Sequence, residues 1–313
     1  MRPLITATLA SIAVLAAPPA AAAQSPHNAH VAPTAARAAA PAGHAAAHTA
    51  TPVITVTARD FAFDAPDTVA AGITTVRLVN KGPELHHVQL LRLDAGKTMA
   101  DLFAAFKAGG PPPAWVHDVG GPNTPVPGGE SQATLDLAPG RYVIACFIPS
   151  ADQTPHVAKG MARELVVAAG AGNAVRAARA ERAGGATPVT LTLRDHSFAL
   201  SRPLAAGRQT VRVRNAAAQS HEVLFVKLAP GKTAQDVAAW VEKQEGPPPG
   251  QPLGGTTGIA RDGWNDVTLD LEPGDYALLC FLPDAKDGKP HIAHGMMTQL
   301  RVEAPARRTT STR

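Results

Sequence analysis

The chain has 313 residues, more than one compact core usually takes, so we expect more than one domain. The net charge is +4, but no basic stripe with interleaved aromatic residues occurs, which disfavours nucleic acid as a partner. A mildly basic, solvated surface is the simpler interpretation of the charge.

The N-terminus predicts export. Met1-Arg2 is followed by an apolar run from Leu4 to Ala17 and by small residues that fit a cleavage site after Ala23. We therefore predict a signal peptide over residues 1–23, with an apolar run too short to span a bilayer. No later segment is a candidate membrane span, so the mature chain is expected to be periplasmic or secreted.

Residues 24–50 are rich in Ala, Pro and His and have no apolar periodicity. This composition predicts a disordered spacer. Its four histidines, His27, His30, His44 and His48, can catch metal ions, but a flexible segment offers no fixed geometry.

From residue 51 onward, short runs rich in β-branched residues alternate with turn residues, which is typical of strands. One helical segment interrupts them, "KTMADLFAAFKAGG", with Thr98 as the expected N-cap. We predict one β-sandwich domain over 51–169, with a short helical insertion.

The second half of the chain repeats the first. Asp60 is answered by Asp195 and Asn80 by Asn215, both at a spacing of 135, and "LAPGRYVIACF" is answered by "LEPGDYALLCF". This register indicates tandem duplication. We predict a linker over 170–186, a second sandwich domain over 187–304 and a basic tail over 305–313.

Cys146 and Cys280 are the only cysteines, and they stand at equivalent strand ends of the two repeats. A disulfide would require their Cα atoms to come within about 7 Å of each other across a domain boundary, which equivalent inner positions rarely do. A buried free thiol is the other simple interpretation. An unpaired thiol in an oxidising compartment is a liability, however, and a metal bond would protect it.

Each cysteine is followed by a His-x4-Met pattern, "PHVAKGM" and "PHIAHGM", after nine and ten intervening residues. Thiolate, imidazole and thioether together suit copper in a trigonal site with a weak axial sulfur. Such a site needs one more imidazole. His86 in "ELHHV" and His221 in "QSHEV" open a strand at matching positions and complete the set.

With these residues the chain resembles the cupredoxin, or type 1 blue copper, family over both repeats. In that family a strand-opening His joins a Cys, a His and a Met from one C-terminal loop. The resemblance implies an all-β fold of two tandem Greek-key β-sandwiches and up to two type 1 copper ions per chain. The implied ligands are His86, Cys146, His156 and axial Met161 in the first domain, and His221, Cys280, His291 and axial Met296 in the second.

The spacing between Cys and His is longer than in plastocyanin-like members and nearer that of copper-containing nitrite reductases. Met297 is an alternative to Met296, but the repeat register favours Met296. His87 is expected at the surface because its counterpart is Glu222. His117, His196 and His294 are not expected to be ligands.

The resemblance to multicopper oxidases and nitrite reductases implies that a catalytic copper ion would be connected to the type 1 copper through a His next to the type 1 Cys. Neither Cys146 nor Cys280 has such a neighbour. We therefore expect a protein that is not an enzyme, and outer-sphere electron transfer is the favoured function. The alternatives are a copper storage or delivery protein and an interaction module without metal. Redox partner and oligomeric state are not identified by the sequence.

Overall fold

The computed structural model describes residues 51–109, 111–170, 188–243 and 245–304. The predicted signal peptide, spacer and tail, and all but the first residue of the predicted linker, lie outside these ranges. We call residues 51–170 the first half and residues 188–304 the second half. Within the described residues, no helix has the length and apolarity needed to cross a membrane.

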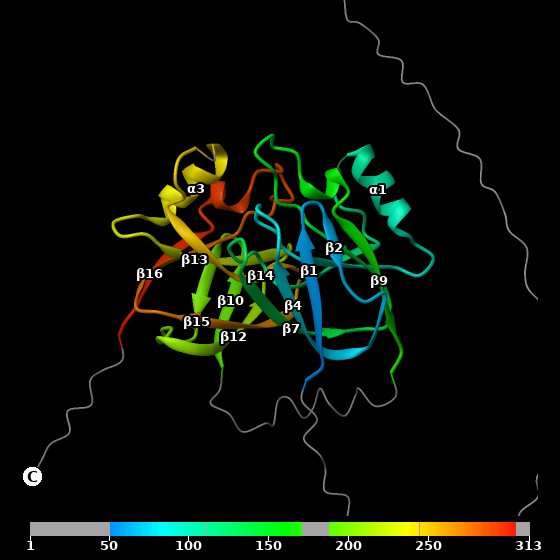
Figure 1. The fold of residues 1–313 in the computed structure, drawn as a ribbon, viewed down its shortest axis with the longest axis horizontal. Coiled ribbons are helices and arrows are strands. Elements are labelled where there is room, and N and C mark those ends of the chain that lie inside the picture. The colour runs from blue at the N-terminus through cyan, green and yellow to red at the C-terminus, as the bar shows by residue number, and fades with distance from the viewer. Residues whose placement is uncertain (1–50, 110, 171–187, 244, 305–313) are drawn as a thin grey trace, which may run out of the picture. The chain divides into compact units, whose positions relative to one another are not determined.

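The first half consists of short strands, one α-helix and one 3₁₀ turn, coloured blue to green in Figure 1. In chain order these are β1 (Val53–Arg59), β2 (Ala62–Asp64), β3 (Thr68–Ala70), β4 (Gly72–Asn80), β5 (Gln89–Leu93), α1 (Met99–Ala108), β6 (Val116–Gly120), β7 (Glu130–Leu137), β8 (Gly140–Ala145), η1 (His156–Lys159) and β9 (Ala162–Ala168).

The second half has the same kinds of element in the same order, except that no described strand corresponds to β3. They are β10 (Val189–Arg194), β11 (Ser197–Leu200), β12 (Gly207–Asn215), β13 (His221–Leu228), α3 (Ala234–Lys243), β14 (Gly250–Ile259), β15 (Trp264–Leu271), β16 (Gly274–Leu279), η2 (His291–His294) and β17 (Met297–Val302). The prediction of an all-β fold with a short helix in each half is confirmed.

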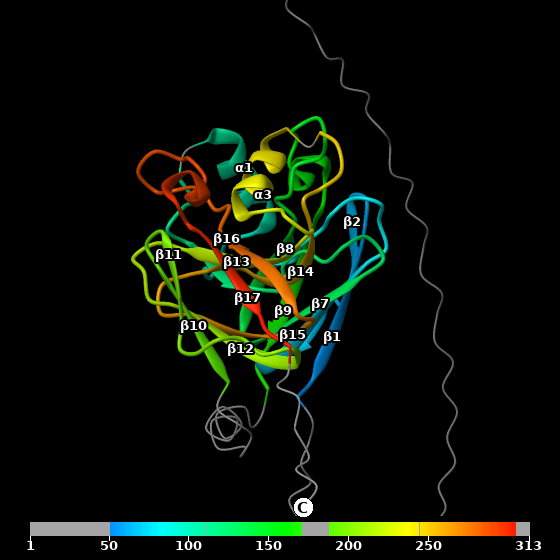
Figure 2. The ribbon, with the colours of Figure 1, turned by 90° about the vertical axis from the view of Figure 1, so that its left-hand side faces the viewer.

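Two sheets run through both halves. One has the order β11-β10-β12-β15-β7-β4-β1-β2, and the other has the order β17-β16-β13-β14-β6-β5-β8-β9-β3. Within the first sheet β1 and β4 are parallel neighbours (Figure 1). Within the second, β16 and β17 pair antiparallel and lie beside each other in Figure 2. The halves meet where β7 pairs with β15 and where β6 pairs with β14.

Both helices begin with a reciprocal cap. Thr98 is the N-cap, as predicted: its hydroxyl accepts a hydrogen bond from the backbone N–H of Asp101. The Asp101 carboxylate in turn accepts one from the backbone N–H of Thr98. Thr233 and Asp236 repeat the arrangement at α3. Each helix therefore has a fixed first turn, although both are only ten residues long.

The core of each half lies between its two sheet layers and reaches the candidate site. Tyr142 in β8 is buried and donates a hydrogen bond from its hydroxyl to the carbonyl of Ala138, 2.8 Å away. Tyr276 in β16 makes the same contact with Glu272. These buried anchors fix the strands that end directly before Cys146 and Cys280.

Candidate metal centres

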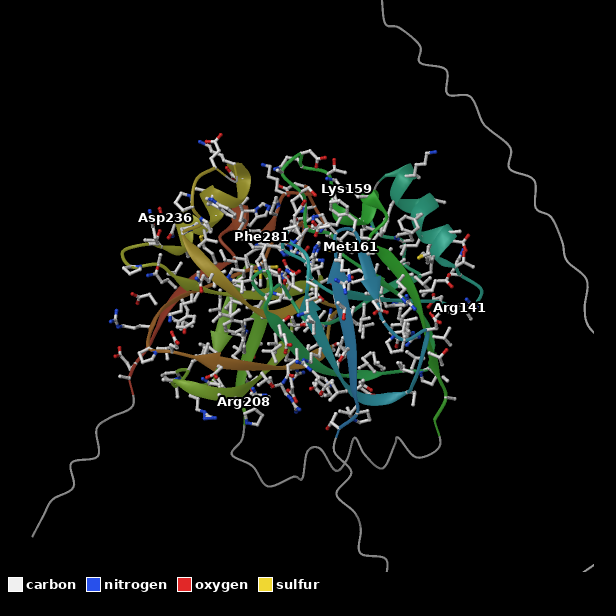
Figure 3. All side chains as sticks on the ribbon, in the orientation of Figure 1. Arg141, Lys159, Met161, Arg208, Asp236 and Phe281 are labelled. Carbon is white, nitrogen blue, oxygen red and sulfur yellow. The ribbon has the colours of Figure 1, made fainter. Side chains whose placement is uncertain are left out.

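The predicted site residues of the first half come from three strand ends. His86 precedes β5, Cys146 follows β8, and His156 begins the 3₁₀ turn of the loop that leads to Met161 and β9. The backbone closes this loop on itself, because the Cys146 N–H donates to the Met161 carbonyl at 3.2 Å and the Val157 N–H donates to the Cys146 carbonyl at 2.7 Å. Figure 3 labels Met161 together with Lys159 of the same loop.

These strand ends bring three donor atoms together. His86 Nδ1 and His156 Nδ1 are 3.1 Å apart, and Cys146 Sγ is 3.4 Å from His156 Nδ1. The three side chains offer donor atoms that all lie within 4.8 Å of one another, and all three residues have zero solvent exposure. We call this set the first cluster.

The second cluster has the same form. His221 Nδ1 and His291 Nδ1 are 3.0 Å apart, and Cys280 Sγ lies 3.8 Å and 3.3 Å from these two atoms. These three residues also have zero solvent exposure. Both cysteines are free, so no disulfide joins them.

Carboxylates fix the orientation of the imidazoles. His86 Nε2 is 2.6 Å from Asp60 Oδ1, and His156 Nε2 is 2.9 Å from Glu84 Oε2. A carboxylate accepts a hydrogen bond from the nitrogen that faces it, so this network assigns a proton to Nε2 of each ring. The two Nδ1 lone pairs then converge across 3.1 Å, which favours a cation between them.

The second cluster has only one such hydrogen bond between an imidazole and a carboxylate. His221 Nε2 is 3.2 Å from Asp195 Oδ1. His291 Nε2 is buried without a hydrogen-bond partner, and the nearest carboxylate oxygen, Asp284 Oδ2, is 3.8 Å away. Burial lowers the pKa of His221, and lowers that of His291 to about 4, so both rings are neutral at neutral pH.

The thiols lie in an apolar interior. Burial raises the pKa of Cys146 to about 12, and it also raises the pKa of Cys280. Backbone N–H groups point at both sulfurs, among them that of His87 at Cys146 Sγ and that of Glu222 at Cys280 Sγ, each at 3.5 Å. A thiolate at either position therefore needs a cation for compensation.

The two predicted axial methionines are fully buried beside the clusters. Met161 belongs to the same core as Cys146, and Met296 belongs to the same core as Cys280. Met297 packs instead against the separate group of apolar residues that contains Val237 of α3. The structure thus distinguishes the two neighbouring methionines by the core that each one joins.

The expectation that His87 is a surface residue is wrong. His87 and Glu222 are both buried, and each accepts the backbone N–H that follows the cysteine: Phe147 N–H donates to His87 Nε2 and Phe281 N–H donates to Glu222 Oε1, both at 2.9 Å. Glu222 also accepts from Asn123 of the other half at 3.2 Å. Burial lowers the pKa of His87 to about 3 and raises that of Glu222 to about 7.

The donor set fits copper. For metal bonds of about 2.0 Å to nitrogen and 2.3 Å to sulfur, two nitrogens on one tetrahedral ion lie roughly 3.3 Å apart, and nitrogen and sulfur roughly 3.5 Å. The observed separations of 3.0 to 3.1 Å between nitrogens and of 3.3 to 3.8 Å between nitrogen and sulfur are close to these values. Two imidazoles, one thiolate and a nearby thioether are the ligands of trigonal copper sites.

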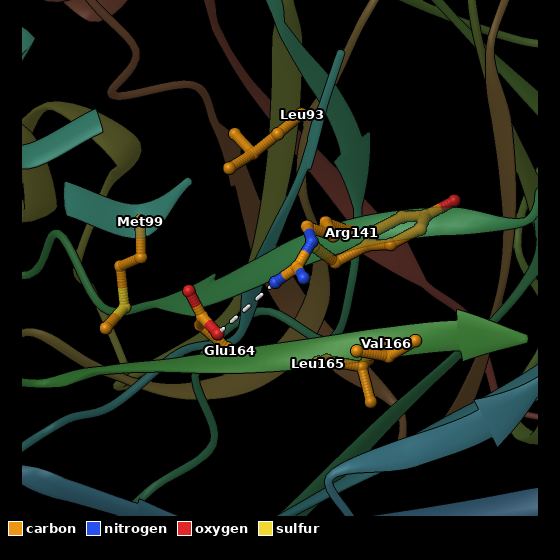
Figure 4. Close-up of a pocket in the computed structure, with 7 residues that line it drawn as sticks. Leu93, Met99, Arg141, Glu164, Leu165 and Val166 are labelled. Carbon is orange, nitrogen blue, oxygen red and sulfur yellow. Dashed lines mark ion pairs between the residues drawn. The ribbon is translucent and has the colours of Figure 1, made fainter. Parts of the chain in front are cut away.

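The pocket in Figure 4 is separate from both clusters. It is lined by residues of β5, α1, β8 and β9, and it includes the ion pair between Arg141 and Glu164 at 3.8 Å. None of the clustered His or Cys side chains lines it. We assign it no function.

No protein-family model matches the chain, and no curated protein matches it. Among solved structures, auracyanin from Roseiflexus castenholzii is 22% identical and covers 39% of this chain and 100% of its own, with a TM-score of 0.27. A copper-containing nitrite reductase from Thermus scotoductus is 12% identical and covers 81% of this chain and 62% of its own, with a TM-score of 0.22. A blue copper oxidase from Nitrosomonas europaea is 14% identical and covers 82% of this chain and 86% of its own, with a TM-score of 0.23.

With TM-scores of 0.22 to 0.27, these likenesses carry no argument about the role of this chain. One expectation from the sequence needs correction. The sequence led us to expect a protein that is not an enzyme, but the similar structures include a nitrite reductase and copper oxidases, which are enzymes. The expectation that the chain is not an enzyme is therefore withdrawn.

Proposed function

We propose that each cluster binds one copper ion in a type 1 site and that the protein transfers electrons in the periplasm or outside the cell. The ligands would be His86, Cys146 and His156 with Met161 axial in the first half. In the second half they would be His221, Cys280 and His291 with Met296 axial. The bound metal would supply a one-electron redox couple.

One observation carries this proposal. In the first cluster both imidazoles direct Nε2 to a carboxylate, so their Nδ1 lone pairs face each other beside a buried thiol. Without a cation this arrangement leaves convergent donors in a space that excludes water. A soft cation satisfies all of them at once.

The protein's own residues give the site the properties that electron transfer needs. Asp60 and Glu84 hold the imidazole planes in place, and the folded loop holds Cys146 and Met161, so little rearrangement accompanies a change in charge. The His87 N–H points at the sulfur and stabilises negative charge there. Apolar packing around Cys146 and Met161 keeps the local dielectric low.

The test is the addition of cupric ion to the purified apoprotein, followed by visible absorption spectroscopy and metal counting. The proposal requires an intense thiolate-to-copper band and up to two copper ions per chain. Pale binding that a chelator reverses easily would favour a storage or delivery protein instead. No binding at all would reject copper in both roles and leave an interaction module.

A further inference from the structure

The two clusters differ in what lies outside the second imidazole. In the first half this shell is formed by Glu84, Phe61, Ser150 and Lys159. The corresponding positions in the second half carry Gln219, His196, Asp284 and His294. A carboxylate, an aromatic ring, a hydroxyl and an ammonium are thus replaced by an amide, an imidazole, a carboxylate and a second imidazole.

In the first half these residues contact one another in ways that need no ion. Glu84 Oε2 accepts a hydrogen bond from His156 Nε2 at 2.9 Å. The Lys159 ammonium lies over the Phe61 ring, 4.8 Å from its centroid, and also pairs with Asp152 at 3.0 Å. The shell around His156 therefore has its own cation and its own anions.

In the second half the same shell gathers metal-binding groups. His196 Nε2 is 3.0 Å from Asp284 Oδ2, and the rings of His196 and His294 stack with centroids 5.0 Å apart. Asp284 shares one group of close donor atoms with His196 and His291, and a second such group with Asp287 and His294. The Asp284 carboxylate is thus the common member of a set that includes three imidazoles.

A second, independent observation concerns His291, which faces Asp284 of this group. Gln219 does not replace the acceptor that Glu84 provides, because its amide donates to Asp284 Oδ2 at 2.9 Å. His291 Nε2 is consequently left without a hydrogen-bond partner, although the side chain has zero exposure, and it faces Asp284 Oδ2 at 3.8 Å. A buried ring nitrogen without a partner is costly unless something binds it.

We propose that the second half holds a divalent transition-metal ion at an additional site formed by His196, Asp284 and His294, with His291 Nε2 as its innermost ligand. Imidazole and carboxylate donors suit ions such as Zn²⁺, Cu²⁺ and Ni²⁺. The His196 and His294 side chains are 33% and 30% exposed, so an ion reaches this site from solvent. When both the buried cluster and the outer site are occupied, His291 would bridge the two ions as an imidazolate, through Nδ1 and Nε2, and its remaining ring proton would be released to solvent.

This proposal depends neither on electron transfer nor on the two thiols. Its test distinguishes the additional metal site from the copper sites proposed above. The probe is Zn²⁺, which is redox-silent, counted per full-length chain after equilibration with glycine as a weak competitor. His196→Phe and His294→Lys install the residues of the first half. Each substitution should remove one zinc ion per chain, both in the natural background and in a chain that carries Cys146→Ser and Cys280→Ser.

The first half supplies the matched control. Installing the residues of the second half there, as the combined variant Phe61→His, Glu84→Gln, Ser150→Asp and Lys159→His, should add one zinc ion per chain. Histidines of residues 24–50 are common to every variant and cancel in the differences. The proposal is overturned if His196→Phe and His294→Lys bind as much zinc as their parents in both backgrounds. If the natural chain showed no thiolate-to-copper band but these differences in bound zinc were still observed, only the type 1 copper sites would be rejected.

Discussion

Gly82 is packed so closely against His86 that a Cβ at residue 82 would lie 2.6 Å from His86 Nε2. The same Cβ would lie 2.3 Å from Asp60 Oδ1, so it would occupy the contact that clamps the imidazole. The second half has Ala217 at the corresponding position, and there the contact between His221 and Asp195 is longer, 3.2 Å against 2.6 Å. The additional methyl group of Ala217 thus coincides with a longer contact between the imidazole and its carboxylate.

Gly82→Ala is therefore expected to weaken metal binding at the first cluster by about 10-fold, the lower end of the cost of losing an outer contact to a ligand. Competition with a chelator of known affinity measures the change. Ala217→Gly is the matched control and should tighten the second cluster or leave it unchanged. Equal affinity of the first cluster before and after Gly82→Ala would show that the clamp does not control the ligand.

Metal binding should release protons. Because burial raises the pKa of Cys146 to about 12, the folded apoprotein carries a neutral thiol at neutral pH, and a metal ion must displace its proton. The apparent affinity of each cluster should rise about 10-fold per pH unit near neutrality. Calorimetry in buffers of different ionisation enthalpy counts the released protons. If nearly no protons were released per bound ion, the cysteine sulfur would not be a ligand.

Glu222 should make the second half less stable as the pH rises. Burial raises its pKa to about 7 from an ordinary 4.5, so between these values the folded chain keeps a proton that the unfolded chain has lost. The free energy of unfolding should therefore fall across this window, by on the order of 3 kcal/mol. Denaturant unfolding of the apoprotein at a series of pH values measures it.

Glu222→Gln is the control for this effect. The amide oxygen still accepts the Phe281 N–H but does not titrate, so the difference between the two proteins isolates the carboxyl group. This difference should grow from pH 4.5 towards pH 7. Parallel stability profiles would contradict the assignment of a protonated Glu222.

Met161→Leu should raise the reduction potential of copper in the first cluster. Removing a weak thioether donor disfavours the more highly charged cupric state, and each tenfold change in relative binding corresponds to about 59 mV for one electron. A redox titration followed by absorption measures the shift. Met297→Leu should leave the potentials unchanged, because Met297 packs with a core separate from that of Cys280. Equal shifts from both substitutions would argue against axial ligation.

The sequence identified residues that share a chemistry and a register. His86, Cys146 and His156 were predicted together because their types and spacings recur. Strand patterns placed His86 and Cys146 at strand ends, and the His-x4-Met pattern placed His156 in the loop after Cys146. The structure brings their donor atoms together. The start of α1 was also predictable, because Thr98 and Asp101 form a local cap.

Long-range contacts were not predictable in the same way. His87 and Glu222 have the sequence signature of surface residues, because both members of the repeated pair are polar. In the structure both are buried, and each accepts a hydrogen bond from a backbone N–H some 60 residues away in the sequence. The recurrence of Asp60 at Asp195 was a signal for the clamps, although only the fold shows which imidazole each one contacts. The positions that correspond to His196 and His294 carry Phe61 and Lys159 rather than histidines, so a search for repeated histidines does not find them.

The proposal that each cluster holds copper through a thiolate is tested most directly by titrating cupric ion into the natural chain and into Cys146→Ser, Cys280→Ser and the double variant. The account predicts that each single substitution removes about half of the intense visible band, if the two sites absorb similarly, and that the double variant has none. A band that survives in the double variant would contradict it, as would a natural chain that binds cupric ion without any such band.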